Sequence, residues 1–262
     1  MAMRQGCALF TAGVLALWLG AAIPAVSEEA QGTATGPEAN ERQNGRQEVI
    51  VLLHGLGRSA RNLLILEWRL RAKGYRVCNV DYDTRVGGIE EILRDVGPQV
   101  AACEEGAQSV HFVTHSLGGL VLRALLESQP LPKARRAVML APPNRGSEIA
   151  DRLRAWNVTS AVLGPLAGQL GTRETDLPQR LPMPRIPFAV IAGDRWVNPV
   201  GPLWLPAPHD GTVSVASTKL DGMADHLVVP HTHTFIMNSS QVANQIDAFL
   251  QEGRFSRDTS EH

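Results

Sequence analysis

The sequence lacks an excess of charge of either sign, since its 262 residues include 25 Lys and Arg against 26 Asp and Glu. A near-neutral chain offers no extended basic face for nucleic acid, so no nucleic-acid partner is expected. No segment recurs with a period of about 20 to 50 residues, which excludes a repeat architecture. Hydrophobic residues make up 44% of the chain, enough for one large α/β domain or at most two small ones.

Cysteine is also scarce, with 3 residues in the chain. Cys7 lies in an N-terminal apolar segment without the preceding pattern of a lipoprotein, so no lipidation is expected there. In an exported protein, Cys78 and Cys103 allow one disulfide. We favour this bridge because Cys78 lies in a strand-like run and Cys103 near the end of a helix-like run that should pack nearby. Two buried thiols, packed as small hydrophobes, are the alternative.

Long hydrophobic runs are absent except at the N-terminus. There, Arg4 is the only charge before an apolar run over Cys7–Leu19, which small residues and then two glutamates follow. This pattern predicts a secretory signal peptide over residues 1–27, cleaved after Ser27, and therefore a periplasmic or secreted protein. An uncleaved membrane anchor is the alternative, since the apolar stretch is just long enough to span a bilayer. Gly20 and Pro24 interrupt it, which favours cleavage.

The rest of the chain predicts one folded domain with polar ends. Residues 28–46 have almost no large apolar side chain and cannot offset the entropy of ordering, so we expect a flexible linker. The domain is expected over residues 47–253, followed by a mobile tail at 254–262.

Short apolar, β-branched runs alternate with helix-like segments along this domain. Continuous apolar runs are typical of parallel strands that are buried on both faces. The order therefore predicts a doubly wound, mostly parallel α/β sheet. The expected strands are 48–55, 75–82, 109–116, 135–143 and 188–195, and the expected helices are 59–74, 88–106, 117–129, 147–156 and 240–250.

The stretch VHFVTHSLGGL places Ser116 where a predicted strand ends and a predicted helix begins. That context makes a G-x-S-x-G-like match meaningful, because strand and helix nearly touch there and flanking residues must be small. Gly118 and Gly119 fit the pattern, whereas Thr114 replaces the upstream glycine. We expect a slightly wider turn there and a functional nucleophile. A serine in an ordinary glycine-rich loop is the alternative.

Upstream, His54–Gly57 directly follows the first strong strand, in the run VLLHGLG. Together with Ser116, this run resembles secreted bacterial lipases and esterases of the α/β-hydrolase superfamily. The run APPNRGS at 141–147 is similar to one that follows the next strand in lipases. The resemblance implies an α/β-hydrolase fold and an oxyanion hole made by the backbone N–H groups of Leu56 and Leu117, while His54 orders the loop.

Two aspartates compete for the acid of a catalytic triad, which this fold places after the serine in the chain. Asp194 directly ends a predicted strand. Asp210 lies in a loop, in a D-G-x-V run that resembles the one carrying the acid in bacterial lipases. We favour Asp210, with Asp194 as its rival. Most loop aspartates act only as turn residues or helix caps.

Three histidines compete for the base. His226 opens a predicted strand and would lie at the wrong end, whereas His231 and His233 precede the final helix. The run from His233 resembles the corresponding part of lipases, so His233 is assigned as the base and His231 as a loop or supporting residue. No H-E-x-x-H run or cysteine pair accompanies them, so no zinc site is expected. Asp221 and Asp225 could ligate Ca²⁺, but solvated loop acids are favoured.

These residues predict a mechanism without a cofactor. His233 removes the proton of Ser116, Asp210 orients the imidazole, and the two N–H groups bind the oxyanion before water releases the acyl group. The expected enzyme is a carboxylic ester hydrolase of the lipase/esterase type. The alternatives are a phospholipase, thioesterase or amidase with the same triad, and a non-catalytic binding protein with this fold.

The substrate is expected to be an ester with a lipid-like acyl chain. Residues 145–185, inserted after a strand, include a helix-like segment and a Gly/Pro/Leu-rich middle, and they predict a cap over the site. Trp156, Trp196 and Trp204 are candidates for its rim, although tryptophans are more often core or interface residues. Transient contact with a membrane or lipid surface is a further expectation.

Overall fold

The fold is built on parallel strands. The computed structural model describes residues 48–85, 87–155, 164–197 and 201–257, all within one compact unit, residues 36–262. The expected signal peptide and linker, and residues 258–262 of the expected tail, lie outside the described residues. The prediction of a mobile tail from residue 254 is wrong at its start, because Phe255 is buried in the core with its ring centroid 5.6 Å from that of Phe249. The described strands form a six-stranded sheet in the order β2-β1-β3-β4-β5-β6, with every neighbouring pair parallel. They are β1 (Glu48–Leu53), β2 (Arg76–Val80), β3 (Ser109–His115), β4 (Ala134–Leu140), β5 (Phe188–Gly193) and β6 (Asp225–Val229).

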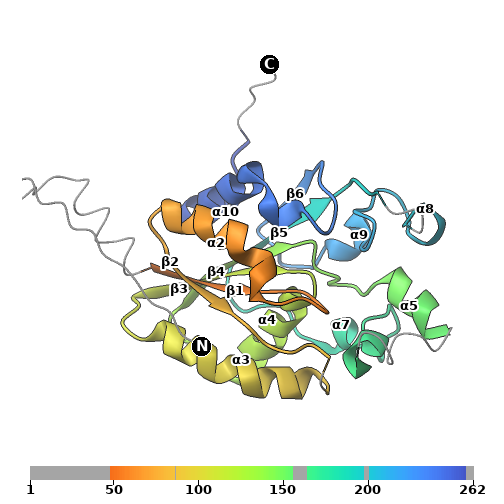
Figure 1. The fold of residues 1–262 in the computed structure, drawn as a ribbon, viewed down its shortest axis with the longest axis horizontal. Coiled ribbons are helices and arrows are strands. Elements are labelled where there is room, and N and C mark those ends of the chain that lie inside the picture. Colours follow the sequence, from red (N-terminus) through yellow and green to blue (C-terminus); the bar gives the residue numbers. More distant parts are fainter. Residues whose placement is uncertain (1–47, 86, 156–163, 198–200, 258–262) are drawn as a thin grey trace, which may run out of the picture. The chain divides into compact units, whose positions relative to one another are not determined.

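Helices cover both faces of this sheet. Figure 1 shows α2 and α10 above the sheet and α3 and α4 below it. Short helical segments lie in the loops after β1 and after the strands β4 to β6. The helical elements are η1 (Ala60–Leu63), α2 (Leu64–Ala72), α3 (Ile89–Glu104), α4 (Leu117–Ser128), α5 (Glu148–Ala155), η2 (Pro165–Gln169), α7 (Leu177–Arg180), α8 (Gly201–Trp204), α9 (Val215–Thr218), η3 (Ile236–Asn238) and α10 (Ser240–Glu252).

The core consists of two apolar layers, one on each face of the sheet. In β1, Ile50 and Leu52 pack into the layer under α2 and α10, whereas Val49, Val51 and Leu53 pack into the layer under α3 and α4. Successive side chains of a strand point to opposite faces, and here both faces are covered. This explains the continuous apolar runs and confirms the predicted doubly wound α/β sheet.

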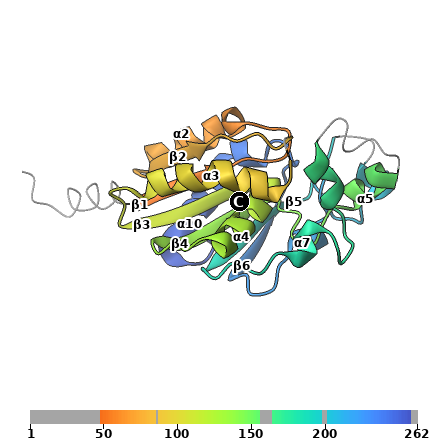
Figure 2. The same cartoon turned by 90° about the horizontal axis from the view of Figure 1, so that it is seen from below.

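The expected cap follows β4. The range 145–185 contains α5, η2 and α7, and Figure 2 shows α5 and α7 beyond one end of the sheet. Residues 156–163, with Trp156, lie outside the described residues. The single-turn helices α7, α8 and α9 were not predicted, because segments of four residues carry no helical periodicity. No helix in the described ranges is long and apolar enough to cross a bilayer.

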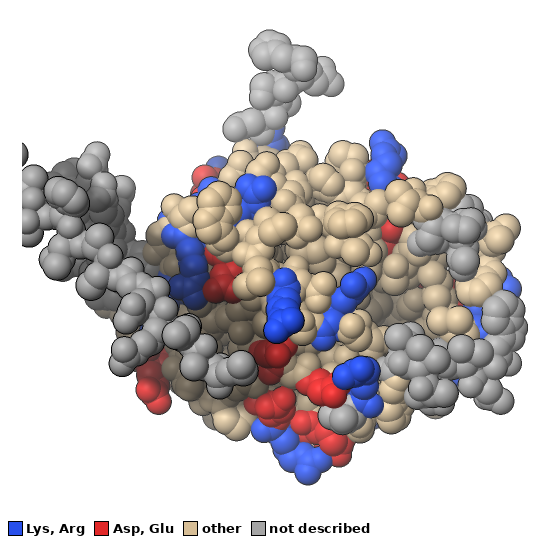
Figure 3. All heavy atoms as spheres, in the orientation of Figure 1, with Lys and Arg blue, Asp and Glu red and all other residues tan. Residues whose placement is uncertain are grey.

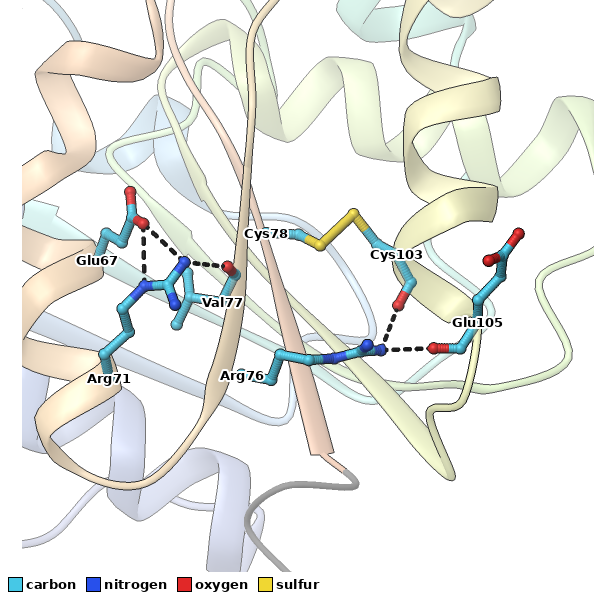
Figure 4. Close-up of a disulfide and its surroundings, with 7 residues drawn as sticks. All are labelled: Glu67, Arg71, Arg76, Val77, Cys78, Cys103 and Glu105. Carbon is cyan, nitrogen blue, oxygen red and sulfur yellow. Dashed lines mark hydrogen bonds and ion pairs between the residues drawn. A yellow bond between two sulfur atoms is a disulfide. The ribbon is translucent and has the colours of Figure 1, made fainter.

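A disulfide joins the edge strand β2 to α3, as the sequence favoured. Cys78 and Cys103 are bonded, with 6.1 Å between their Cα atoms. Figure 4 shows Arg76 beside the bridge, where its guanidinium donates to the carbonyl oxygens of Cys103 and Glu105 at 2.7 and 2.8 Å. These carbonyls end α3 and lack helical donors, so the cation satisfies them. The bridge and Arg76 together hold α3 on an edge strand that has only one neighbour.

Reduction of this disulfide should destabilise the fold. It should not alter the candidate functional site, described below, which lies at the far ends of the strands. The bridge spans 25 positions of sequence and should add about 3 kcal/mol to the free energy of unfolding by restricting the unfolded chain. Urea unfolding with and without reductant measures this. The Cys78→Ala/Cys103→Ala variant is the control and should not respond to reductant. Two free thiols at Cys78 and Cys103, in non-reducing mass spectrometry of protein purified without reductant, would contradict the bridge.

Candidate active site

Ser116 forms a strained turn between β3 and α4. Its backbone lies at φ 55° and ψ −123°, in the region that residues with a Cβ rarely adopt. Its N–H donates to the carbonyl oxygen of Leu140 at the end of β4, at 2.9 Å. The turn therefore presents the serine hydroxyl at the carboxyl edge of the sheet, where the neighbouring strands also end.

Glycines permit the close packing that this turn requires. A Cβ on Gly118 would lie 2.3 Å from the carbonyl oxygen of Leu53, and a Cβ on Gly119 would lie 2.9 Å from the Cβ of Pro142. Both distances are shorter than van der Waals contact, so no larger residue fits without a shift of the chain. The side-chain oxygen of Thr114 lies 3.5 Å from the Cβ position of Gly119, an ordinary contact. Thr114 is therefore accommodated where a glycine is usual, while a wider turn stays a prediction.

A chain of hydrogen bonds links Ser116 to His233 and Asp210. The Nε2 atom of His233 lies 3.0 Å from the Oγ of Ser116, and its Nδ1 lies 2.7 Å from an oxygen of Asp210. Asp210 and His233 are buried. The structure thus brings together the three side chains that the sequence selected, in the arrangement by which an imidazole can remove the proton of a hydroxyl.

The carboxylate of Asp210 is held by its own loop. Its second oxygen accepts hydrogen bonds from the backbone N–H groups of Thr212 and Val213, at 2.9 and 2.8 Å. Its carbonyl oxygen accepts from the N–H of His233 at 3.0 Å. Both carboxylate oxygens are therefore engaged, one with the turn and one with the imidazole, so the acid is oriented before any ligand arrives.

Asp194, the rival acid, does not contact His233. Its backbone N–H donates to Val229 at 3.1 Å, and its carboxylate lies 3.5 Å from the guanidinium of Arg195. No hydrogen bond between described residues joins its side chain to the imidazole. Asp194 directly follows β5, and its backbone N–H joins the end of β5 to Val229 at the end of β6.

The other two histidine candidates lie outside this chain of hydrogen bonds. The ring of His226 on β6 lies 3.1 Å from the hydroxyl of Thr218. His231 contributes backbone contacts, since its N–H donates to Val229 and its carbonyl accepts from Arg195. His233 alone of the three hydrogen-bonds to Ser116 among the described residues.

His115 supports His233, a role that the sequence reasoning missed. Its Nε2 lies 2.9 Å from the carbonyl oxygen of His233, and the two rings are 4.8 Å apart. Burial lowers the pKa of the His115 imidazole well below its usual range, and the nearby His233 lowers it further, so His115 is neutral and its ring N–H can donate to that carbonyl. In the sequence, the only indication of this supporting role was that His115 directly precedes Ser116.

The loop after β1 lies against the turn at Ser116. His54 is fully buried and stacks on Tyr82 with 4.0 Å between ring centroids, and burial lowers its pKa. The hydroxyl of Tyr82 donates to the carbonyl of His54 at 2.6 Å. A Cβ on Gly55 would lie 3.1 Å from the Cβ of Ser116. These contacts fix the loop that carries Leu56 beside the serine.

The expected oxyanion-hole donors are the backbone N–H groups of Leu56 and Leu117. Leu117 is the first residue of α4, and the first N–H groups of a helix have no partner within the helix. Leu56 follows Gly55 in the fixed loop and lines the pocket in front of Ser116. Among hydrogen bonds between described residues, neither N–H has an acceptor.

A pocket of about 230 Å³ opens over Ser116 and His233. Its walls come from the loop after β1, from α5 and η2 of the expected cap, and from the loop that carries Asp210. Trp196 and Trp204 are not among the described residues that line it. The apolar lining residues are Leu56, Pro143, Ile149, Ala150, Leu153, Ala167, Leu170 and Val213.

The acids considered for Ca²⁺ have protein partners. Asp221 pairs with Arg145 at 3.1 Å, and Asp225 pairs with Arg257 and accepts from the N–H of Phe255 at 2.8 Å. No group of three or more His, Cys, Asp or Glu within the described ranges is placed to hold a metal ion.

Comparison with known proteins agrees with this architecture. A family model described as the Alpha/beta hydrolase family matches residues 50–249. The chain therefore belongs to the alpha/beta hydrolase family. No curated protein matches the chain.

Similar solved structures include bacterial lipases and esterases. The mature lipase BlEst2 of Bacillus licheniformis is 18% identical, over 79% of this chain and 91% of that chain, with a TM-score of 0.59. A lipase-esterase related protein of Clostridium acetobutylicum is 14% identical, over 79% and 96%, with a TM-score of 0.52. The metagenomic carboxyl esterase MGS0156 is 18% identical, over 71% and 64%, with a TM-score of 0.52. At these identities the likeness shows the fold.

Gly118→Ala should destabilise the protein strongly, because the added Cβ meets the backbone oxygen of Leu53 rather than a flexible side chain. We expect a loss of at least about 2 kcal/mol in the free energy of unfolding, measured by urea denaturation. Gly88→Ala is the control: its Cβ would meet only glutamate side-chain oxygens, at 3.2 Å or more, and should cost no more than about 1 kcal/mol. Equal losses in the two variants would contradict the close packing.

Proposed function

We propose that the protein is a serine hydrolase that cleaves carboxylic esters, with lipid-like acyl esters as substrates. The single observation that carries the proposal is the hydrogen-bonded series Asp210, His233 and Ser116 at the base of a largely apolar pocket. The fold of lipase and esterase neighbours supports it. The apolar walls from α5 and η2 suit an acyl chain, which would be removed from water on binding.

In the proposed mechanism, His233 acts as the general base. It accepts the proton of Ser116 as the hydroxyl oxygen attacks the ester carbonyl carbon, while Asp210 stabilises the imidazolium. The N–H groups of Leu56 and Leu117 bind the negatively charged oxygen of the tetrahedral intermediate. His233 then protonates the departing alcohol. The resulting acyl-enzyme is hydrolysed by a water that His233 activates in the same way.

We further propose that the mature protein is exported, with residues 1–27 removed as a signal peptide. The N-terminal apolar run supports this, and so does the disulfide between Cys78 and Cys103, because such bridges persist mainly in oxidising compartments. The expected cap role of 145–185 is part of the same proposal, since residues of α5 and η2 line the pocket.

A fluorophosphonate probe tests the proposed nucleophile. The wild-type protein should be labelled, and Ser116→Ala should lose labelling and ester hydrolysis together, because only an activated serine reacts with the probe. A folded wild-type protein that is not labelled would identify a non-catalytic binding protein. Rates on p-nitrophenyl esters, thioesters and anilides of matched acyl chain then rank the esterase against the thioesterase and amidase alternatives.

Asp210→Asn should reduce kcat by about 10⁴-fold, because the neutral amide no longer holds the imidazole in the required tautomer. Asp194→Asn is the matched control, since that carboxylate pairs with Arg195 instead, and it should retain most of the wild-type kcat. Steady-state kinetics on p-nitrophenyl butyrate measures both. If Asp194→Asn loses more activity than Asp210→Asn, the acid has been assigned to the wrong residue.

A further inference from the structure

The helix α2 is apolar on its outward side as well as its inward side. Leu66 and Leu70 are fully buried in the core, whereas Leu64, Ile65 and Trp68 are 53%, 46% and 66% exposed. A surface helix normally presents polar side chains to water. Leu64, Ile65 and Trp68, which we call the α2 face, therefore form an exposed apolar patch of the kind that marks an interaction site.

Cations lie beside the α2 face, although Asp81 and Asp83 line a surface pocket together with Arg58. Arg58 and Arg61 are exposed, and neither has an acidic partner among the described residues. The guanidinium of Arg69 lies 5.9 Å from the ring centroid of Trp68. The nearby Glu67 is already paired with Arg71 at 2.9 Å.

Figure 3 agrees with this distribution of charge. Around α2 it shows mainly tan atoms with Lys and Arg beside them and a few acidic atoms among these, and most of the visible acidic atoms lie lower on the molecule. The patch is therefore apolar at its centre and mainly basic at its edge.

The α2 face lies beside the mouth of the catalytic pocket. The loop that leads into η1 and α2 contributes Leu56 and Arg58 to the pocket lining, and Thr234 contributes from the other side. The next residue, Phe235, is 59% exposed, and the 3-10 helix η3 that follows it packs against α2. A surface that contacts the α2 face would therefore also meet the pocket mouth.

We propose that the α2 face docks the protein on an anionic lipid surface and so brings the pocket over Ser116 to its substrate. Leucine, isoleucine and tryptophan enter the boundary between headgroups and acyl chains, where an indole ring is especially favoured. Arg58, Arg61 and Arg69 face the negative headgroups, as cations do on membrane-bound amphipathic helices. The delivery of substrate rests on the proposed function, whereas docking itself does not require Ser116.

Charge argues against a second copy of the chain as the occupant. In a symmetric dimer the α2 face would meet itself, and Arg61 and Arg69 of both copies would be brought close together. An anionic lipid surface complements the same cations.

Flotation with lipid vesicles tests docking in full-length Ser116→Ala, which does not consume the lipid. Its affinity for mixed phosphatidylcholine and phosphatidylglycerol vesicles should exceed that for phosphatidylcholine alone. Adding Leu64→Ser, Ile65→Ser and Trp68→Ser should lower it at least about tenfold. The matched control is Met183→Ser, which removes an apolar side chain of 50% exposure from another part of the surface. Any lipid affinity of residues 1–27 is common to all variants.

Two further readouts do not depend on the triple variant folding. Arg61→Glu should weaken binding to the anionic vesicles by at least about fivefold, because each cation near such a surface contributes about that factor. Brominated lipids should quench tryptophan fluorescence in the parent and less in Trp68→Phe, because Trp68 lies in the bilayer boundary.

Three results would overturn the proposal: no affinity of the parent for anionic vesicles, equal affinity of the parent and the triple variant, or a dimer of the parent that dissociates in the triple variant. The last result would identify a second copy as the occupant. Hydrolysis of soluble p-nitrophenyl butyrate by the chain with Ser116 intact should be unchanged by the triple substitution. Absence of that hydrolysis in the wild type would contradict the proposed function. It would not change the conclusion about docking, which the vesicle experiment tests independently.

Discussion

The close approach of α4 to the end of the sheet is the constraint on which the site depends. Ser116 is the single residue between the end of β3 and the start of α4, and it adopts a positive φ. The first turn of the helix therefore passes within contact distance of the carbonyl oxygen of Leu53. Only glycine at 118 permits that approach. The strain is maintained because the parallel strands on either side are buried and hydrogen-bonded. As a result, the serine hydroxyl and the N–H of Leu117, which has no acceptor among the described residues, lie at the same edge of the sheet.

The other half of the site comes from loops that stabilise one another. The carbonyl of Asp210 accepts from the N–H of His233, the carbonyl of His233 accepts a hydrogen bond from His115, and the Asp210 carboxylate is held by two N–H groups of its own turn. The backbone hydrogen bond between Asp210 and His233 thus joins two segments that are distant in sequence, and the His115 ring and the Asp210 carboxylate hold them further. Such fixed geometry costs little reorganisation when a reaction begins.

The connection from β1 to β2 contributes residues to the candidate site, to the core and to the exposed apolar surface. Its first residues carry Leu56 to the serine, and its helix packs Leu66 and Leu70 into the core while Trp68 stays exposed. The site and the apolar surface are therefore neighbours because one short segment carries both. The disulfide at Cys78 lies on the strand that follows, so the same connection is secured at its far end.

The sequence by itself determined the order of strands and helices, the parallel sheet and the position of Ser116, because these follow from local periodicity and from the glycines beside a strand end. The short helices α7 to α9 carry too few residues for any periodicity. The local sequence pattern also did not decide between Asp210 and Asp194 as the acid, or between His233 and His231 as the base. Only the tertiary structure separated them, because the direction of a loop side chain depends on contacts with residues far away in sequence. The exposure of Leu64, Ile65 and Trp68 was decided in the same way: a run of apolar residues does not reveal which of them the rest of the fold covers.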